Sequence, residues 1–135
     1  MGKQKKRENI LLSSVEIIDT ANKGRSVVKY DGRAIFIRGG VPGDICDISI
    51  FKKRKKYWEA NINKIHKYSD KRTDPKCEHF GICGGCKWQN MKYKSQLEYK
   101  QNEVFNNLKR IGRTNLPISS KIIGAEKKYY YRNKM

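Results

Sequence analysis

Three cysteines lie within ten residues of this chain, in the run CEHFGICGGC at residues 77–86. Cys77, Cys83 and Cys86 have the spacing C-x5-C-x2-C, with three glycines between them. Glycine adopts backbone conformations that other residues avoid, so this loop can turn tightly enough to point several sulfurs at one centre. Thiolates are ligands for zinc and for iron–sulfur clusters. The spacing therefore favours a small metal-binding loop.

A pair of disulfides is the alternative for these cysteines, because Cys46 makes their number even. The N-terminus, MGKQKKREN, is basic, and the apolar segment of a signal peptide does not follow it. We therefore expect a cytoplasmic protein, and disulfides rarely persist in that compartment. Clustered cysteines in such a protein more often hold a metal.

Two kinds of metal site fit the loop. His79 completes the pattern C-x-H-x3-C-x2-C, which would form a closed zinc site. Alternatively, the three thiolates hold most of an iron–sulfur cluster, and the fourth ligand lies elsewhere. The spacing leaves both sites open. Cys46 is expected to stand apart, because it alternates with Ile48 and Ile50 in a strand-like run and would face a core.

The charge of the chain predicts an anionic partner. Thirty-one Lys and Arg residues against thirteen Asp and Glu give a net charge of +18, an excess that favours nucleic acid. No stretch approaches the roughly 18 apolar residues of a membrane-spanning helix. An unbroken run of five cations is followed by two aromatic residues, a combination typical of proteins that bind single-stranded RNA. The candidate RNA-binding residues are Lys52, Lys53, Arg54, Lys55, Lys56, Tyr57 and Trp58.

The sequence predicts a mainly β fold. Residues 1–9 form a basic tail that we expect to be disordered. Residues 10–67 contain five strand-like runs, which favour a small closed barrel of the OB type. Asp31-Gly32 is a typical hairpin turn between the second and third of these runs. The expected strands lie around residues 15–17 and at 26–30, 34–38, 45–51 and 57–66.

The rest of the chain is predicted to contain one helix. Residues 68–90 form a linker and the cysteine loop. Apolar residues recur at helical spacing over 91–112, and Gly112 suits the end of a helix. Residues 113–135 are expected to begin a further α/β or α+β domain that is truncated at Met135.

Several motifs resemble known families. The run FIRGGVPGD at residues 36–44 resembles the TRAM domain, a small RNA-binding barrel. The runs CGGCKWQ at 83–89, RIG at 110–112 and YRNK at 131–134 resemble the RNA uracil-5-methyltransferases. The resemblance extends over nearly the whole chain from about residue 10, and the cysteine string is its most specific part. The ribosomal RNA type is favoured over the transfer RNA type.

The resemblance implies a [4Fe-4S] cluster held by four cysteines. Three of them match Cys77, Cys83 and Cys86, and the fourth would lie beyond Met135. A structural or RNA-positioning role is expected for the cluster, because methyl transfer moves no net electrons.

The family transfers a methyl group from S-adenosylmethionine to a uracil carbon in ribosomal or transfer RNA. Its catalytic cysteine and carboxylate lie in a C-terminal domain that this chain lacks, so no catalytic residue is assigned here. The alternative is a non-enzymatic RNA-binding protein with a barrel and a zinc knuckle. That knuckle would use Cys77, His79, Cys83 and Cys86.

Overall fold

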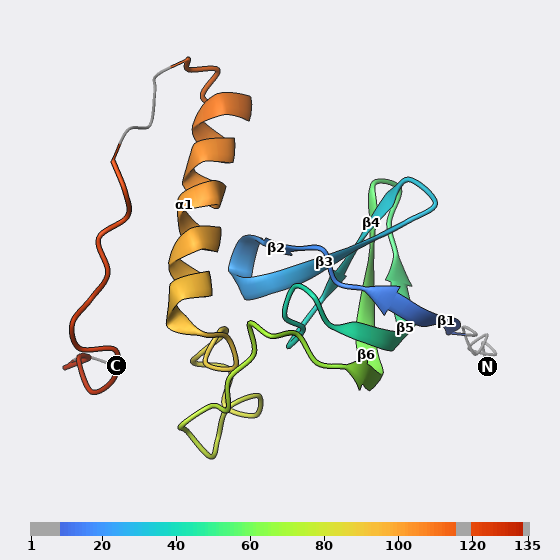
Figure 1. Ribbon diagram of the computed structural model, residues 1–135. Helices are drawn as coiled ribbons and strands as arrows, with labels where there is room; N and C mark the ends of the chain where they lie inside the picture. The colour runs from blue at the N-terminus through green and yellow to red at the C-terminus, as the bar shows by residue number, and fades with distance from the viewer. Residues whose placement is uncertain (1–8, 116–119, 134–135) are drawn as a thin grey trace, which may run out of the picture. The chain divides into compact units, whose positions relative to one another are not determined.

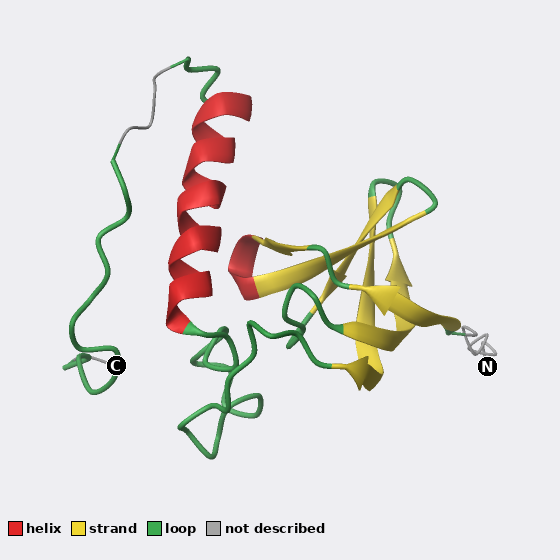
Figure 2. Ribbon diagram, in the orientation of Figure 1, coloured by secondary structure: helices red, strands yellow, loops and turns green. Residues whose placement is uncertain are grey.

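The chain divides into two compact units, Met1–Lys92 and Tyr93–Met135. The computed structural model describes residues 9–115 and 120–133. All strands of the described residues lie in the first unit, and the long helix lies in the second (Figures 1 and 2). The two units are described separately below.

The first unit is a six-stranded sheet in the order β1-β5-β6-β4-β3-β2. The parallel pair is β4 with β6, and the other neighbours are antiparallel. A short 3-10 turn, η1 (Asn22–Gly24), joins β2 to β3. The strands are β1 (Ile10–Glu16), β2 (Asp19–Ala21), β3 (Arg25–Tyr30), β4 (Arg33–Ile37), β5 (Ile45–Lys53) and β6 (Tyr57–Lys67).

One continuous segment closes this sheet into a barrel. β1 pairs with β5 at one edge, and the same segment continues into β2, which pairs with β3 at the other edge. In the link between β1 and β2, the Ile17 N–H donates to Asp44 O (2.9 Å), and the Ile18 N–H donates to Val27 O (2.9 Å). The predicted mainly β, barrel-like fold is confirmed. It has six strands where five were expected, because the segment at the first predicted strand is divided at Ile17 and Ile18.

Local sequence explains the hairpin between β3 and β4. Asp31 and Gly32 both have positive φ, 48° and 71°. Two such residues form a turn whose twist matches that of the flanking strands, and Asp-Gly is a preferred pair for it. The predicted hairpin turn at this position is confirmed.

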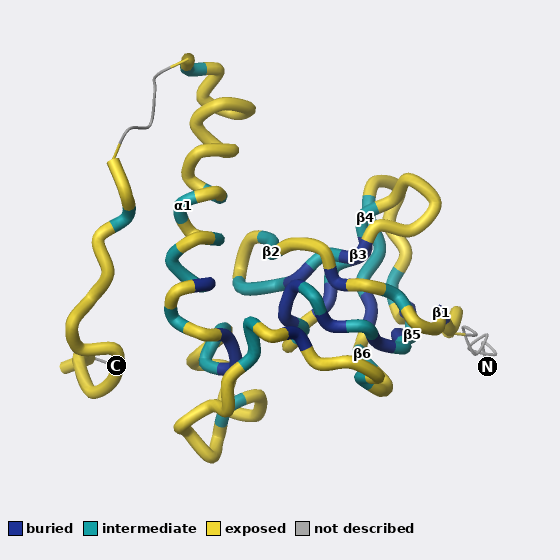
Figure 3. The backbone as a smooth tube through the Cα atoms, viewed as in Figure 1, coloured by how far each residue is buried: buried dark blue, intermediate teal, exposed yellow. Residues whose placement is uncertain are grey.

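The core lies inside the barrel and follows the alternation of the strands (Figure 3). In β5, Cys46, Ile48 and Ile50 are buried, while the residues between them are half-buried. Cys46 is fully buried, so its predicted place in the core is confirmed. The buried core residues are Leu12, Ile17, Val28, Ile35, Ile37, Cys46, Ile48, Ile50 and Ala60.

The second unit contains α1 (Tyr93–Arg110), which lies inside the predicted range of 91–112. The N–H groups of Ile111 and Gly112 both donate to Asn107 O and end the helix. Residues 120–125 run along α1. The Gln101 side chain accepts from the Ile122 N–H (3.0 Å), and the Tyr93 hydroxyl accepts from the Ala125 N–H (2.6 Å). Within the described residues, α1 and the shorter helical turn are not apolar and long enough to span a bilayer.

Candidate nucleic-acid interface and cysteine loop

The run of five cations forms the turn between β5 and β6. Lys52 and Lys53 end β5, and the Arg54 N–H closes the turn by donating to Tyr57 O (2.9 Å). Lys52 is half-buried and forms an ion pair with Glu59 (3.7 Å), whereas the other four cations are exposed. The turn therefore presents a concentrated positive charge to solvent.

Tyr57, the first residue of β6, belongs to a ring pair on the face of the sheet opposite the core. Its ring centroid lies 5.3 Å from that of Phe36, and the two planes are tilted by 56°. The guanidinium of Arg25 lies over the Phe36 ring at 4.4 Å. Neither Phe36 nor Arg25 was among the RNA-binding candidates of the sequence analysis. Strand alternation could have found them, because it places both on the face of Tyr57 once the register of β3, β4 and β6 is known.

Trp58 lies on the other face of β6, because successive side chains of a strand point to opposite faces. It is half-buried and packs against the core. Two cations cover its ring, with Arg33 at 5.0 Å and Lys53 at 5.1 Å from the centroid. Of the two aromatic residues predicted to bind RNA, Tyr57 is therefore the better placed to stack on a base.

The cysteine loop exposes all three of its thiols, whereas Cys46 is buried. Gln89 joins the two ends of the loop: its Oε1 accepts from the Cys77 N–H (2.9 Å), and its Nε2 donates to Cys86 Sγ (3.3 Å). The Gly85 N–H donates to Cys83 Sγ (3.3 Å). The loop therefore separates its cysteines from Cys46, as the alternation in β5 predicts.

The loop does not show a formed metal centre. Among the residues that the structure describes, no three Cys, His, Asp or Glu side chains gather where they could hold a metal ion. The donor set nevertheless suits a thiolate-held metal, because two of the three sulfurs accept N–H hydrogen bonds. Such bonds help to set the properties of iron–sulfur clusters. The ligand roles of Cys77, Cys83 and Cys86 stay a prediction, as does the zinc alternative with His79.

The segment before the cysteine loop is bound to the barrel. Asp44 is fully buried, and its carboxylate accepts from the N–H groups of Val41 (2.7 Å) and Ser69 (2.9 Å). The Ser69 hydroxyl donates to Pro42 O (2.6 Å). The guanidinium of Arg72 completes the set with hydrogen bonds to Asp44. Residues 69–72 thus fix where the loop begins.

The end of the cysteine loop packs closely against η1. A Cβ atom at Gly24 would lie 2.3 Å from Lys87 Cβ and 3.5 Å from Trp88 Nε1. Gly24 also has a φ of +68°, which favours glycine. The Asn90 side chain donates to Gly39 O (2.9 Å). Both ends of the loop are therefore attached to the barrel.

Similar proteins were found among curated sequences. A protein of Bacteroides thetaiotaomicron described as an uncharacterized RNA methyltransferase is 45% identical over 115 residues, which are 85% of this chain and 25% of that protein. The 23S rRNA (uracil(1939)-C(5))-methyltransferase RlmD of Legionella pneumophila is 32% identical over 114 residues, 84% of this chain and 26% of RlmD. The chain belongs to this RNA methyltransferase family. It spans about a quarter of the length of the curated relatives that it matches.

Other RNA methyltransferase relatives agree with this assignment. A further uncharacterized one, from Listeria monocytogenes, is 37% identical over 130 residues, or 96% of this chain and 28% of that protein. No model of a known protein family matches the chain. Because the Listeria match covers 96% of the chain, the part shared with this RNA methyltransferase family includes the barrel, the cysteine loop and α1.

Proposed function

We propose that this chain is the RNA-binding and iron–sulfur region of an S-adenosylmethionine-dependent RNA uracil-5-methyltransferase that acts on ribosomal RNA. The similarity to a ribosomal RNA uracil-5-methyltransferase carries the proposal, since it covers 84% of the chain. The exposed cationic turn and the ring pair beside it support an RNA-binding role. The rest of the activity would belong to the longer protein that contains this chain.

Within that protein, the residues of this chain would bind and position RNA. The exposed cations of the turn would contact phosphates, and the rings of Tyr57 and Phe36 would stack on bases. Cys77, Cys83 and Cys86 would supply three of the four ligands of a [4Fe-4S] cluster. S-adenosylmethionine would supply the methyl group, and no residue of this chain is assigned to its binding or to catalysis.

Salt dependence of RNA binding tests the role of the cationic turn. The chain should bind a single-stranded oligonucleotide, and its affinity should fall as salt rises, because neutralised phosphates release counterions. Each phosphate contact contributes roughly −0.7 to the slope of log affinity against log salt. Replacing Lys53, Arg54 and Lys55 by alanine should therefore flatten the slope by about two units. Fluorescence anisotropy over a salt series measures it.

A matched triple variant distinguishes a specific RNA-binding site at the turn from a general effect of net positive charge. Lys94, Lys100 and Arg110 are exposed cations of α1. Replacing them by alanine removes the same charge, and we expect a smaller change of slope than at the turn. Equal changes in the two triple variants would contradict a binding role specific to the turn.

Methyl transfer tests the activity of the longer protein. With S-adenosylmethionine and a 23S ribosomal RNA transcript, nucleoside mass spectrometry should detect 5-methyluridine. A transfer RNA transcript serves as the comparison. Methylation of transfer RNA alone would overturn the ribosomal assignment, and a methylated product other than 5-methyluridine would overturn the reaction.

A further inference from the structure

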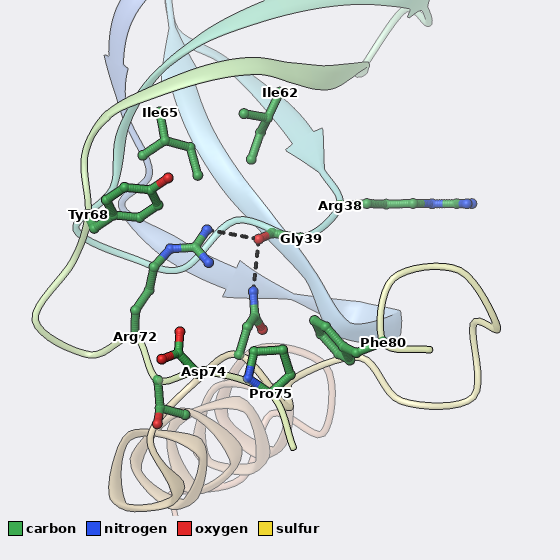
Figure 4. A pocket seen from close by; sticks show the side chains of 11 residues that line it. Arg38, Gly39, Ile62, Ile65, Tyr68, Arg72, Asp74, Pro75 and Phe80 are labelled. Atoms are coloured by element: carbon green, nitrogen blue, oxygen red, sulfur yellow. Dashed lines mark hydrogen bonds between the residues drawn. The ribbon is translucent and has the colours of Figure 1, made fainter. Parts of the chain in front are cut away.

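A groove of about 800 Å³ lies within the first unit, between β6 and the segment that leads into the cysteine loop (Figure 4). Ile62 and Ile65 of β6 line one side of it in this view, and the rings of Tyr68 and Phe80 lie toward its opposite ends. Tyr68 is 66% exposed. A groove of this size, with an apolar wall on β6 and two rings, is large enough for a small planar ligand.

Hydrogen bonds between three of its lining residues fix the floor of this groove. The Arg72 Nη2 and the Asn90 Nδ2 both donate to Gly39 O, at 3.1 and 2.9 Å. Arg72 is also held by the carboxylate of Asp44, and its guanidinium lies 5.5 Å from the centre of the Tyr68 ring. The ring therefore has a cation held at a fixed place beside it. A groove ordered before binding loses less entropy when a ligand enters.

The charges around the groove limit the kind of ligand. The positive charge of Arg72 is paired with Asp44. Asp74 is exposed on the side opposite β6, and its carboxylate disfavours an anion within the groove. Arg38 is exposed and extends outward from the groove on the side away from Tyr68 (Figure 4). The groove thus suits a neutral flat group whose negative charge lies outside it, near Arg38.

We propose that this groove binds one unstacked nucleotide of single-stranded RNA. The base lies on the Tyr68 ring beside the aliphatic side chains of β6, and a phosphate of the same strand contacts Arg38 on the other side of the groove. A nucleobase has the flat apolar faces that the groove can bury, and the net charge of +18 favours a nucleic acid over a peptide. The inference rests on the proposed RNA-binding function and adds a site distinct from the cationic turn.

Variants of Tyr68 test the stacking contact with an oligonucleotide of roughly 12 nucleotides, within the range that one OB-type fold covers. Tyr68→Ala should weaken binding roughly 5-fold to 150-fold, the loss expected for one stacked base. Tyr68→Phe keeps the ring and should bind like the unmodified chain. Tyr131→Ala is the control, because Tyr131 is also 66% exposed but lies outside the groove, and it should have little effect.

An abasic scan of the oligonucleotide distinguishes a bound base from an indirect effect on folding. At one position, removing the base should weaken binding to the unmodified chain but not to Tyr68→Ala. Arg38→Ala should flatten the salt slope by about 0.7, the contribution of one phosphate.

The outcomes separate this inference from the proposed function. If the unmodified chain does not bind RNA, the proposed function and the inference both fail. If it binds and the cationic-turn variant weakens binding, but Tyr68→Ala binds as tightly as the unmodified chain, the inference alone is overturned. The groove would then have another occupant, such as a peptide. Equal losses for Tyr68→Phe and Tyr68→Ala would also overturn stacking.

Discussion

The guanidinium of Arg72 binds the buried carboxylate of Asp44 through two parallel hydrogen bonds. Arg72 Nε donates to Oδ1 (2.8 Å), and Nη2 donates to Oδ2 (2.8 Å). Asp44 is fully buried immediately before β5, and Arg72 lies 28 residues later, shortly before the cysteine loop. This bidentate pair therefore joins the barrel to the segment that positions the loop and one side of the groove.

Loss of this pair should destabilise the first unit. Arg72→Ala leaves a buried carboxylate without its cation, and removing one partner of a buried pair costs about 3–5 kcal/mol. Arg38→Ala is the control, because an exposed arginine should change the free energy of unfolding by about 0.5 kcal/mol or less. Urea denaturation of both variants measures the difference. Equal stability would show that water replaces the Arg72 contacts.

Gly24→Ala should weaken the packing of the cysteine loop on the barrel. The added Cβ would collide with Lys87 Cβ at a residue that also has positive φ. Gly32→Ala is a matched control, because Gly32 has a similar φ of +71° and its added Cβ would meet no atom within 4 Å. Both variants carry the backbone cost of about 1–2 kcal/mol. Gly24→Ala should lose about 1–3 kcal/mol more through overpacking, as measured by thermal or urea unfolding. A similar loss in both would contradict a close contact.

Cys46 should react far more slowly than the three loop cysteines. Burial, together with the nearby carboxylates of Asp44 and Asp47, raises the pKa of the Cys46 thiol to about 11. Since the thiolate is the nucleophile, alkylation at pH 8 should be slower by about two orders of magnitude or more. Mass spectrometry of metal-free folded protein treated with iodoacetamide should show three rapid adducts. A fourth should appear on unfolding and be absent from Cys46→Ala.

The same shift predicts a loss of stability at high pH. The folded state prefers the protonated thiol, so this contribution is complete below the pKa of the unfolded chain, roughly 8.5. It should then decline as the pH rises toward 11. Cys46→Ala should lose less stability over this range than the unmodified chain. An equal decline in both proteins would contradict the raised pKa.

The three loop cysteines should carry bound iron, and Cys46 should not. We expect Cys77→Ser, Cys83→Ser and Cys86→Ser each to lower the iron content of the anaerobically purified longer protein. Cys46→Ser should retain it. The present chain alone should hold the cluster poorly, because we expect the fourth ligand of the proposed cluster to lie outside it. A colourless protein with one zinc per chain, lost in His79→Ala, would favour the zinc knuckle instead.

Tyr57 and Trp58 should have different roles although they are adjacent. Trp58→Ala removes a ring packed against the core and should cost about 3 kcal/mol of stability. Tyr57→Ala should change stability less, and it should weaken RNA binding by roughly 1–3 kcal/mol if its ring stacks on a base. Melting temperature and RNA affinity, measured on both variants, decide between the roles. If Trp58→Ala binds RNA more weakly but keeps its stability, then Trp58 contacts RNA and its packing role is wrong.

The sequence by itself determined the parts of this protein that depend on local patterns. The alternation in β5 placed Cys46 in the core, the Asp31-Gly32 pair specified a hairpin, and helical spacing located α1 to within two residues at each end. These features follow from backbone preferences and from the periods of strand and helix, which are properties of neighbouring residues.

Tertiary structure alone decided which distant residues meet. Tyr57 and Trp58 were both RNA-binding candidates in the sequence analysis. Only the register of β4 and β6 placed Phe36 beside Tyr57 and core residues beside Trp58. The contact of Arg72 with Asp44 and that of Lys87 with Gly24 likewise join segments far apart in the chain. These contacts form only when the segments after β6 pack against the barrel. No local pattern specifies them, because each depends on how the whole sheet packs.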